Sequence, residues 1–112
     1  TAVSSGTRGV FAGGKAPGVV DTMEYITIAT EGNGTDFGDL SAAKRNMSGN
    51  NNSVRGTFAG GNLAASGSGS NTNVIEYITI ATTGNTQDFG DLTVIRRCAN
   101  SGGCDAHGGL VR

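Results

Sequence analysis

The sequence predicts an all-β protein built from four-stranded antiparallel sheets, with about two and a half repeats in 112 residues. One observation is a 17-residue segment, Glu24–Leu40, that returns nearly unchanged at Glu76–Leu92. Another is the composition, since 20 glycines, one proline and no tryptophan are typical of a turn-rich β protein. With only four phenylalanines, such a chain must gain stability from strand pairing and from stacking of like units.

The repeat divides the chain into three units, because several segments recur in the same order. EYITIATEGNGTDFGDL and EYITIATTGNTQDFGDL differ at three positions and lie 52 residues apart, while RGVFAGG and RGTFAGG lie 47 apart. LSAAKR parallels LTVIRR, and the closing HGGLV matches the opening of a further unit. The predicted units are blade-like repeats at 1–44 and 45–97, followed by the opening strands of a third repeat at 98–112.

Glycine-containing breaks separate four expected strands in the first unit. These strands are Ala2–Ser5, Arg8–Gly13, Met23–Thr30 and Thr35–Leu40. The third contains EYITIAT and has apolar residues on both faces, so we expect it to be covered on both sides, as in a sheet stacked between two others. Four strands per unit and a period near 50 residues favour the blades of a β-propeller.

The glycine pair that ends VFAGG and TFAGG, followed by a tyrosine-containing strand, resembles the kelch repeat. Phe37 and Phe89 stand where kelch repeats usually have tryptophan, and Arg45 and Arg97 fall near the kelch arginine. The wording RGxFAGG…EYITIATxGNxxDFGDL is similar to kelch-like repeats in structural and tail proteins of bacteriophages, notably marine ones. The resemblance implies a propeller-type scaffold in a virion, although His107 replaces the arginine of the earlier units and a closed propeller needs about four to eight blades.

Charged residues recur at equivalent positions in the two full units. Glu24 and Glu76 are expected on a largely buried strand, and a buried carboxylate needs a charged or hydrogen-bonding partner. The repeated arginines are the candidate partners, so the predicted structural ion pairs involve Glu24, Glu76, Arg8, Arg45, Arg55 and Arg97. A ligand role for the arginines, with a sugar acid or a phosphate, is the alternative.

Two further groups of residues could carry chemistry. The repeated aspartates, Asp36, Asp39, Asp88 and Asp91, do not reach the ligand count of a calcium loop and are expected to fix the turn after the third strand. Cys98 and Cys104 could form a disulfide, remain thiols, or bind a metal together with His107, although their spacing is not a familiar zinc pattern. No catalytic residue, metal or cofactor is assigned.

The feature that differs most between the units is the connection Asn62–Val74, which is five residues longer than its counterpart Lys15–Thr22. A length change in a Gly/Ser/Asn stretch is typical of a surface loop, and the candidate binding residues are Asn62, Ser66, Ser68, Ser70, Asn71 and Asn73. We therefore predict a non-catalytic structural or binding module of a phage tail, a tail fibre or another surface, in a virion or extracellular setting. Its expected partners are other protein chains and a surface glycan.

A net charge of −1 and the lack of a run of basic residues argue against binding to nucleic acid. The sequence contains no apolar segment long enough to span a membrane, so a membrane partner is not expected. The alternative function is a self-assembling extracellular filament or surface-layer subunit. In that reading, the terminal half-repeat at 98–112 pairs its strands with the next chain.

Overall fold

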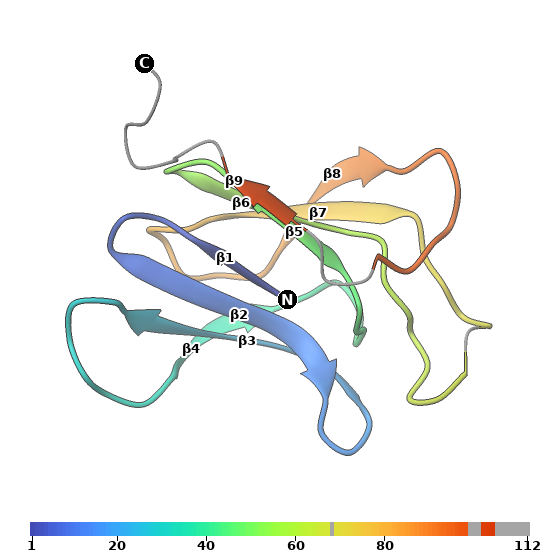
Figure 1. The fold of residues 1–112 in the computed structure, drawn as a ribbon, viewed down its shortest axis with the longest axis horizontal. Coiled ribbons are helices and arrows are strands. Elements are labelled where there is room, and N and C mark those ends of the chain that lie inside the picture. The colour runs from blue at the N-terminus through green and yellow to red at the C-terminus, as the bar shows by residue number, and fades with distance from the viewer. Residues whose placement is uncertain (68, 99–101, 105–112) are drawn as a thin grey trace.

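The computed structural model describes residues 1–67, 69–98 and 102–104, which form strands, turns and loops (Figure 1). Nine strands occur in these residues: β1 (Ala2–Ser4), β2 (Arg8–Lys15), β3 (Val19–Thr27), β4 (Thr35–Asp39), β5 (Ser48–Asn51), β6 (Arg55–Ala59), β7 (Val74–Thr79), β8 (Gln87–Asp91) and β9 (Gly102–Cys104). Within this described part there is no helix, and so none able to cross a lipid bilayer. The all-β prediction is confirmed.

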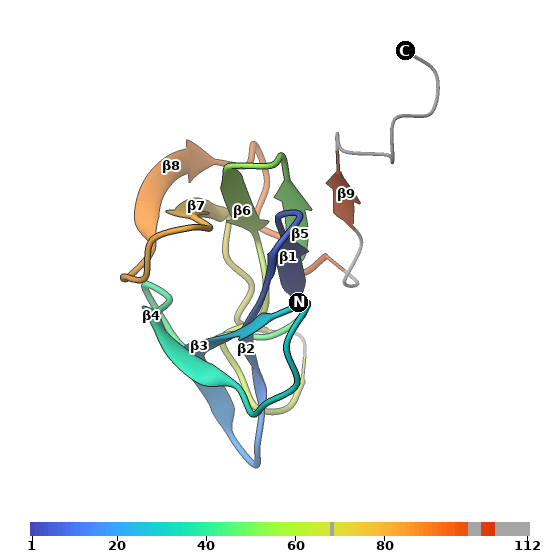
Figure 2. The same cartoon turned by 90° about the vertical axis from the view of Figure 1, so that its left-hand side faces the viewer.

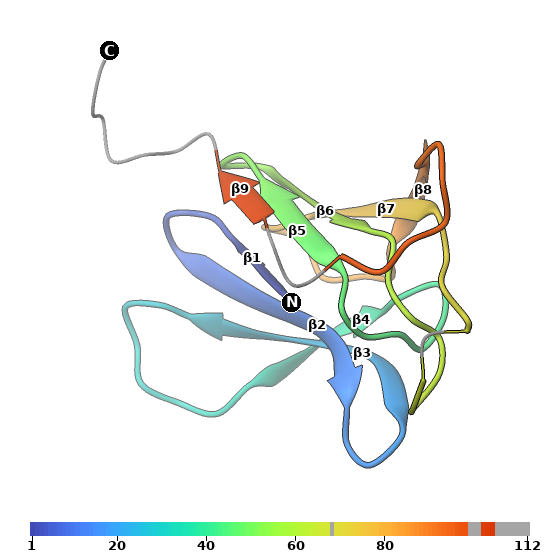
Figure 3. The ribbon, with the colours of Figure 1, turned by 45° about the vertical axis from the view of Figure 1, so that its right-hand side comes forward.

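The strands form two sheets, and the second includes β9, which lies in the segment predicted to open a third repeat. The first sheet is antiparallel with the order β1-β2-β3-β4, and the second has the order β8-β7-β6-β5-β9. Within the second sheet only β9 is parallel to its neighbour, with Gly49 opposite Gly102 and Asn51 opposite Cys104. Figures 2 and 3 show β1, β5 and β9 close together, so the opening strands of successive units are neighbours.

The third strand of the first unit differs from its predicted bounds. It begins at Val19 rather than Met23 because the hairpin continues the ladder from Lys15 opposite Val19, closed by a hydrogen bond from Ala16 N to Gly18 O of 2.7 Å. It ends at Thr27 because Thr30 N turns back to donate to Thr27 O at 3.1 Å. The last three residues of EYITIAT therefore lie outside the strand.

The hydrophobic core lies between the two sheets and takes side chains from both. It consists of Val3, Val10, Ala12, Met23, Phe37, Leu40, Met47, Phe58, Ile78 and Ile80. Each third strand is deeply buried on one face only: Met23 is buried and Glu24 exposed on β3, while Glu76 is buried on β7. The expectation that both faces are covered was wrong for the described sheets, because each has one sheet neighbour instead of two.

The glycine pair of each unit makes room for the segment that follows the fourth strand. Gly13 and Gly60 have φ values of 60° and 65°, a left-handed conformation that favours glycine. A Cβ atom at Gly13 would lie 2.5 Å from Lys44 O, and one at Gly60 would lie 2.6 Å from Arg96 O. The two units therefore hold the backbone at Lys44 and at Arg96 in the same way.

Candidate interaction site between the two sheets

A buried ion pair joins the two sheets. Glu76 lies on β7 of the second sheet, and Lys44 lies in the segment that follows β4 of the first. The two side chains form a salt bridge, and each is 1% exposed. A charge removed from water is strongly unfavourable without a partner, so the position of each side chain depends on the other.

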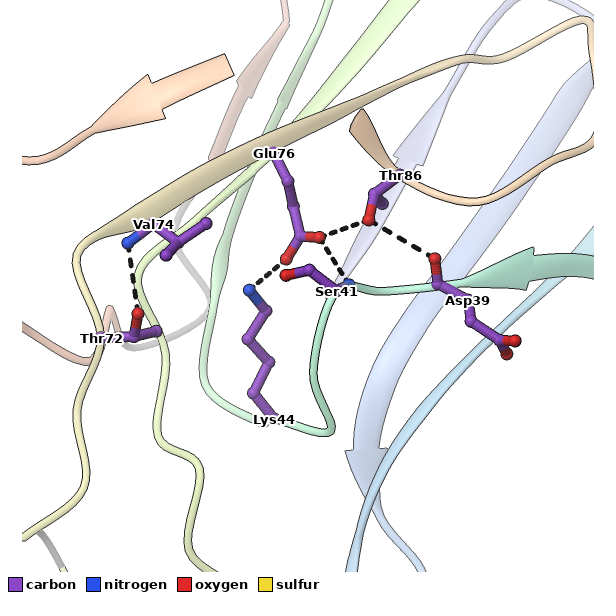
Figure 4. Close-up of polar contacts among 7 residues, drawn as sticks. All are labelled: Asp39, Ser41, Lys44, Thr72, Val74, Glu76 and Thr86. Atoms are coloured by element: carbon purple, nitrogen blue, oxygen red, sulfur yellow. Dashed lines mark hydrogen bonds and ion pairs between the residues drawn. The ribbon is translucent and has the colours of Figure 1, made fainter. Parts of the chain in front are cut away.

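Further donors surround the Glu76 carboxylate, as Figure 4 shows. Ser41 N donates a hydrogen bond of 2.8 Å to Glu76 Oε2, and the Thr86 hydroxyl donates to the same oxygen. Burial by itself would raise the pKa of Glu76, but the hydrogen bonds from Lys44, Thr86 and Ser41 and the positive charge of Lys44 outweigh it and leave the pKa below its ordinary value. The site holds Glu76 as a carboxylate.

The backbones of the two sheets also meet directly, along the outer strand β4. Gly84 N donates to Phe37 O at 2.7 Å, and Thr86 N donates to Asp39 O at 3.0 Å. In the opposite direction, Asp39 N donates to Asn85 Oδ1 at 3.0 Å. The loop between β7 and β8 thus satisfies polar groups that an edge strand would otherwise present to solvent.

The arginines contact tyrosines and carbonyl groups instead of glutamates, so the predicted Glu–Arg pairs were wrong. The guanidinium of Arg8 lies 4.2 Å from the centre of the Tyr25 ring and donates to Ile80 O of the other sheet at 3.0 Å. Arg55 lies 4.5 Å from the Tyr77 ring. A guanidinium combines stacking with hydrogen bonding in a way that suits these sites.

The remaining two arginines also lack a glutamate partner within the described chain. Arg45 Nε donates to Ala64 O at 3.0 Å, and Arg97 is exposed. The residue that sequence reasoning missed is Lys44, the neighbour of Arg45. The available signal was that the alignment of LSAAKR with LTVIRR places a basic residue at both 44 and 96.

Glu24 is exposed, although it occupies the position in the first unit that Glu76 occupies in the second. No described unit lies on its side of the first sheet to provide a lysine, and Gly34 stands where the second unit has the hydroxyl of Thr86. The prediction that Glu24 is buried was therefore wrong. Its exposure depends on which unit lies beside its sheet and not on its local sequence.

The loop Asn62–Val74 is anchored by one of its predicted binding residues. Asn62 is fully buried, and its Oδ1 accepts from Ala64 N at 2.8 Å while its Nδ2 donates to Asn71 Oδ1 at 2.9 Å. Asn62 is therefore a structural residue, and its assignment to the binding surface was wrong. Ser66 and Ser70 are exposed.

The other loop candidates differ in position. Asn71 and Asn73 are half-buried, and Asn73 Nδ2 donates to Leu92 O at 3.5 Å. Ser68 lies outside the described residues. The exposed part of the loop that sequence reasoning identified is thus its tip, around Ser66 and Ser70.

Cys98 and Cys104 are not joined to each other in a disulfide, which was one of the three alternatives. Cys98 N donates to Asn46 O at 2.8 Å, which ties the start of the predicted third unit to the start of the second. Cys104 Sγ accepts from Asn51 Nδ2 at 3.2 Å across the β5–β9 pairing. His107, the third member of the alternative metal set, lies outside the described residues.

The repeated aspartates do not converge on a site. Asp36, Asp39, Asp88 and Asp91 are exposed, and it is the backbone of Asp39, not its carboxylate, that contacts the second sheet. In the described part of the chain, no group of three or more His, Cys, Asp or Glu side chains could hold a metal ion.

Each unit has a shallow hollow beside its repeated tyrosine, under the loop that joins the third and fourth strands. The hollow next to Tyr77 has a volume of about 450 Å³, and the equivalent one next to Tyr25 about 210 Å³. Thr, Gly and Asn residues of the loops line both hollows, and the one next to Tyr25 also includes Glu31. Comparison of the sequence with protein family models and with curated proteins gives no match.

Proposed function

We propose that this chain is a non-catalytic structural and binding module made of kelch-like, propeller-type repeats, and that it serves in a phage tail, a tail fibre or another virion or extracellular surface. The virion setting comes from the resemblance of the repeat wording to phage structural proteins. The structural role comes from the way in which the repeated residues are used.

The observation that carries the structural role is that repeated polar side chains connect strands and sheets. Arg8 and Arg55 stack on the tyrosines of their own units, and Lys44 and Glu76 join the two sheets. A catalytic site would instead gather different acids, bases or nucleophiles in one cleft. Repetition of the same contact in successive units is what a scaffold requires.

The binding role is assigned to the tip of the loop Asn62–Val74. Leu63, Ser66 and Ser70 are exposed there, while Asn62 fixes the base of the loop by hydrogen bonds within it. A tip that is held at its base can change in sequence without loss of the sheet. The small hydroxyl and amide groups of this loop suit a surface glycan or another protein chain.

The test replaces residues 62–74 by the shorter connection of the first unit, KAPGVVDT. Far-UV circular dichroism and cooperative urea unfolding should be retained, because the hydrogen bonds of the Asn62 side chain lie within the segment removed. Binding to immobilised bacterial surface polysaccharides and to intact cells should be lost. A double variant, Ser66→Ala with Ser70→Ala, keeps the Asn62 anchor and should also weaken binding. Unchanged binding by both variants, or no binding by the original chain, would contradict the proposed role of the loop.

A further inference from the structure

We propose that two copies of this chain dock in a head-to-tail manner, with Arg96 of one copy against Glu24 of the other, as Lys44 lies against Glu76 within the chain. Two exposed surfaces would form this contact. The Glu24 face consists of Phe11, Glu24, Ile28 and the loop Gly32–Gly34, and the Arg96 face consists of Arg55, Phe89, Val94, Ile95 and Arg96. The inference rests on the repeat architecture of the proposed function and not on the loop Asn62–Val74.

The Glu24 face has the residues of a sheet interface, but none of the described strands forms a sheet upon it. Phe11 pairs with Glu24 across β2 and β3, just as Phe58 pairs with Glu76 across β6 and β7. Phe58 is 0% exposed, whereas Phe11 is 50% exposed. The same cross-strand pair is therefore buried in the second sheet, which has a neighbour on that side, and open in the first.

The Arg96 face repeats the surface from which Lys44 projects. Arg96 N donates to Thr72 O at 3.2 Å, and Lys44 N donates to the equivalent Val20 O at 3.2 Å. The carbonyl oxygens of Arg96 and Lys44 accept hydrogen bonds from the backbone N–H groups of the equivalent glycines Gly61 and Gly14, both at 3.0 Å. Since the backbone is held alike, the Arg96 side chain starts from the same position relative to its sheet as Lys44.

The apolar residues around Arg96 agree with this. Phe37 is 2% exposed and contacts Tyr25 edge to face, while the equivalent Phe89 makes the same contact with Tyr77 but is 53% exposed. Val94 and Ile95, which follow β8, are also exposed. Exposed large apolar residues that gather in one patch are typical of an interaction surface, and Phe89 lies beside Arg55 while Val94 and Ile95 directly precede Arg96.

The edges of the two faces match in their backbone groups. Within the chain, β4 receives hydrogen bonds from the loop Gly84–Thr86 at Phe37 O and Asp39 O. The equivalent edge is β8, with Phe89 O and Asp91 O, and the equivalent loop is Gly32–Gly34. A second copy that docks in this way would give β8 the hydrogen bonds that β4 already has.

The surroundings of Gly90 on β8 differ from those of the equivalent Gly38 on β4 in the same way. Gly38 has φ 141° and Gly90 has φ 148°. A Cβ atom on Gly38 would collide with the backbone of Gly84, whereas one on Gly90 would meet no atom of the described residues within 4 Å. The second unit thus repeats the backbone conformation without the loop that packs against it in the first unit.

The equivalent arginines Arg8 on β2 and Arg55 on β6 supply another matching contact. Arg8 stacks on Tyr25 and donates to Ile80 O of the neighbouring sheet. Arg55 stacks on Tyr77 in the same way, and Ile28 O of a docked copy is the equivalent acceptor. Two positive side chains, Arg55 and Arg96, therefore face a surface that carries Glu24. The one loss is the Thr86 hydroxyl, because the first unit has Gly34 there.

The strand β9 lies where β1 of a docked copy would be. Within the chain, β1 is the neighbour of β5 on one side, and β9 pairs with β5. All three residues of β9 are exposed, so its exchange for β1 would uncover little apolar surface. Docking therefore requires that β9 leave the edge of β5.

A second copy of this chain is the occupant that fits both faces. The Glu24 face repeats the Glu76 side of the contact within the chain, and the Arg96 face repeats its Lys44 side. Contacts of this kind are heterologous, and they produce a ring if the rotation between copies closes and a filament if it does not. This assembly differs from the alternative drawn from the sequence, in which the segment 98–112 would pair with the next chain.

Sedimentation velocity of the full chain over a concentration series tests the proposal. The weight-average mass should increase with concentration. Glu24→Arg alone and Arg96→Glu alone place like charges opposite each other and should raise the dissociation constant by about a hundredfold or more. The double variant that combines them should regain association, since it restores opposite charges. Asp21→Arg makes the same charge change at an exposed carboxylate outside both faces and should associate as the unmodified chain does.

Both positions are exposed, so circular dichroism should show that each variant folds. A chain that stays monomeric at about 1 mM, where even a contact with a millimolar dissociation constant would be half formed, would overturn the proposal. Association that survives both single reversals would overturn it as well. The loop-binding assay repeated on monomeric Arg96→Glu distinguishes the two ideas, because failure of docking leaves loop binding intact.

Discussion

Lys44 and Glu76 form a salt bridge across the two sheets, with both side chains 1% exposed. The equivalent residues on the outer faces are Arg96 and Glu24, and both are exposed. The chain thus contains one closed and one open form of the same contact. This difference gives matched pairs of variants, in which the same substitution is made at a covered and at an uncovered position.

Phe37→Ala and Phe89→Ala form the first pair. Phe37 is buried between the sheets, so its truncation should lower the free energy of unfolding by about 3–5 kcal/mol. Phe89 is half-exposed, and its truncation should cost less than about 1.5 kcal/mol, mainly through the lost contact with Tyr77. Urea unfolding of both proteins, at a concentration where the chain is monomeric, provides the measurement. Equal losses would show that the sheets do not pack as described.

Gly38→Ala and Gly90→Ala form the second pair. Both positions have a positive φ that is strained for alanine, so both variants should be destabilised. Only at Gly38 would the new methyl group collide with the Gly84 backbone. The Gly38 variant should therefore lose more stability, by about 1–3 kcal/mol. Thermal unfolding followed by circular dichroism would compare them, and a Gly90 variant that is the less stable of the two would contradict the contact between β4 and the loop.

Acid should weaken the contact between the sheets. The pKa of Glu76 is lowered in the folded chain because the donors from Lys44, Thr86 and Ser41 outweigh the effect of burial. The stability that its ionisation contributes is therefore present above its ordinary pKa of about 4.5 and is lost as the pH falls through the lower, folded-state value. Urea unfolding between pH 7 and pH 3 should show this decline.

Glu76→Gln and Glu24→Gln separate this effect from the general effect of acid. An amide side chain cannot titrate, so the Glu76→Gln variant should be less stable at pH 7 but should lose less stability below pH 4.5. Glu24 is exposed, and Glu24→Gln should have a stability at pH 7 close to that of the unmodified chain, which makes it the control for the loss caused by Glu76→Gln. A Glu76→Gln protein that declines as steeply as the parent would refute the assignment.

The sequence predicted the all-β class, the four strands of the first sheet and the position of the variable loop. These follow from repetition, alternation and glycine breaks, which are local properties. The ion pair could not be read in this way. Arg45 and Arg97 were the predicted partners because they recur as arginines in both units. The direction of the Lys44 side chain depends instead on how the segment after β4 turns against the Gly-Gly pair.

The burial of the two glutamates also could not be predicted from the local sequence pattern. Glu24 and Glu76 lie in identical EYITIAT segments, yet one is exposed and the other buried. The difference lies in the neighbour on that side of each sheet, and identical segments contain no information about neighbours. The parallel pairing of β9 with β5 was missed for a related reason, since it joins the start of one unit to the start of the next.

The central claim, that a buried Lys44–Glu76 pair joins two repeated sheets, is tested most directly by a double-mutant cycle with Lys44→Met and Glu76→Leu. Each single variant leaves an unpaired buried charge and should lose about 3–5 kcal/mol of unfolding free energy, while the double variant should recover most of this loss. Glu24→Leu with Lys44→Met is the control cycle, and it should be additive within about 0.5 kcal/mol. Additive losses in the Lys44–Glu76 cycle would contradict the account.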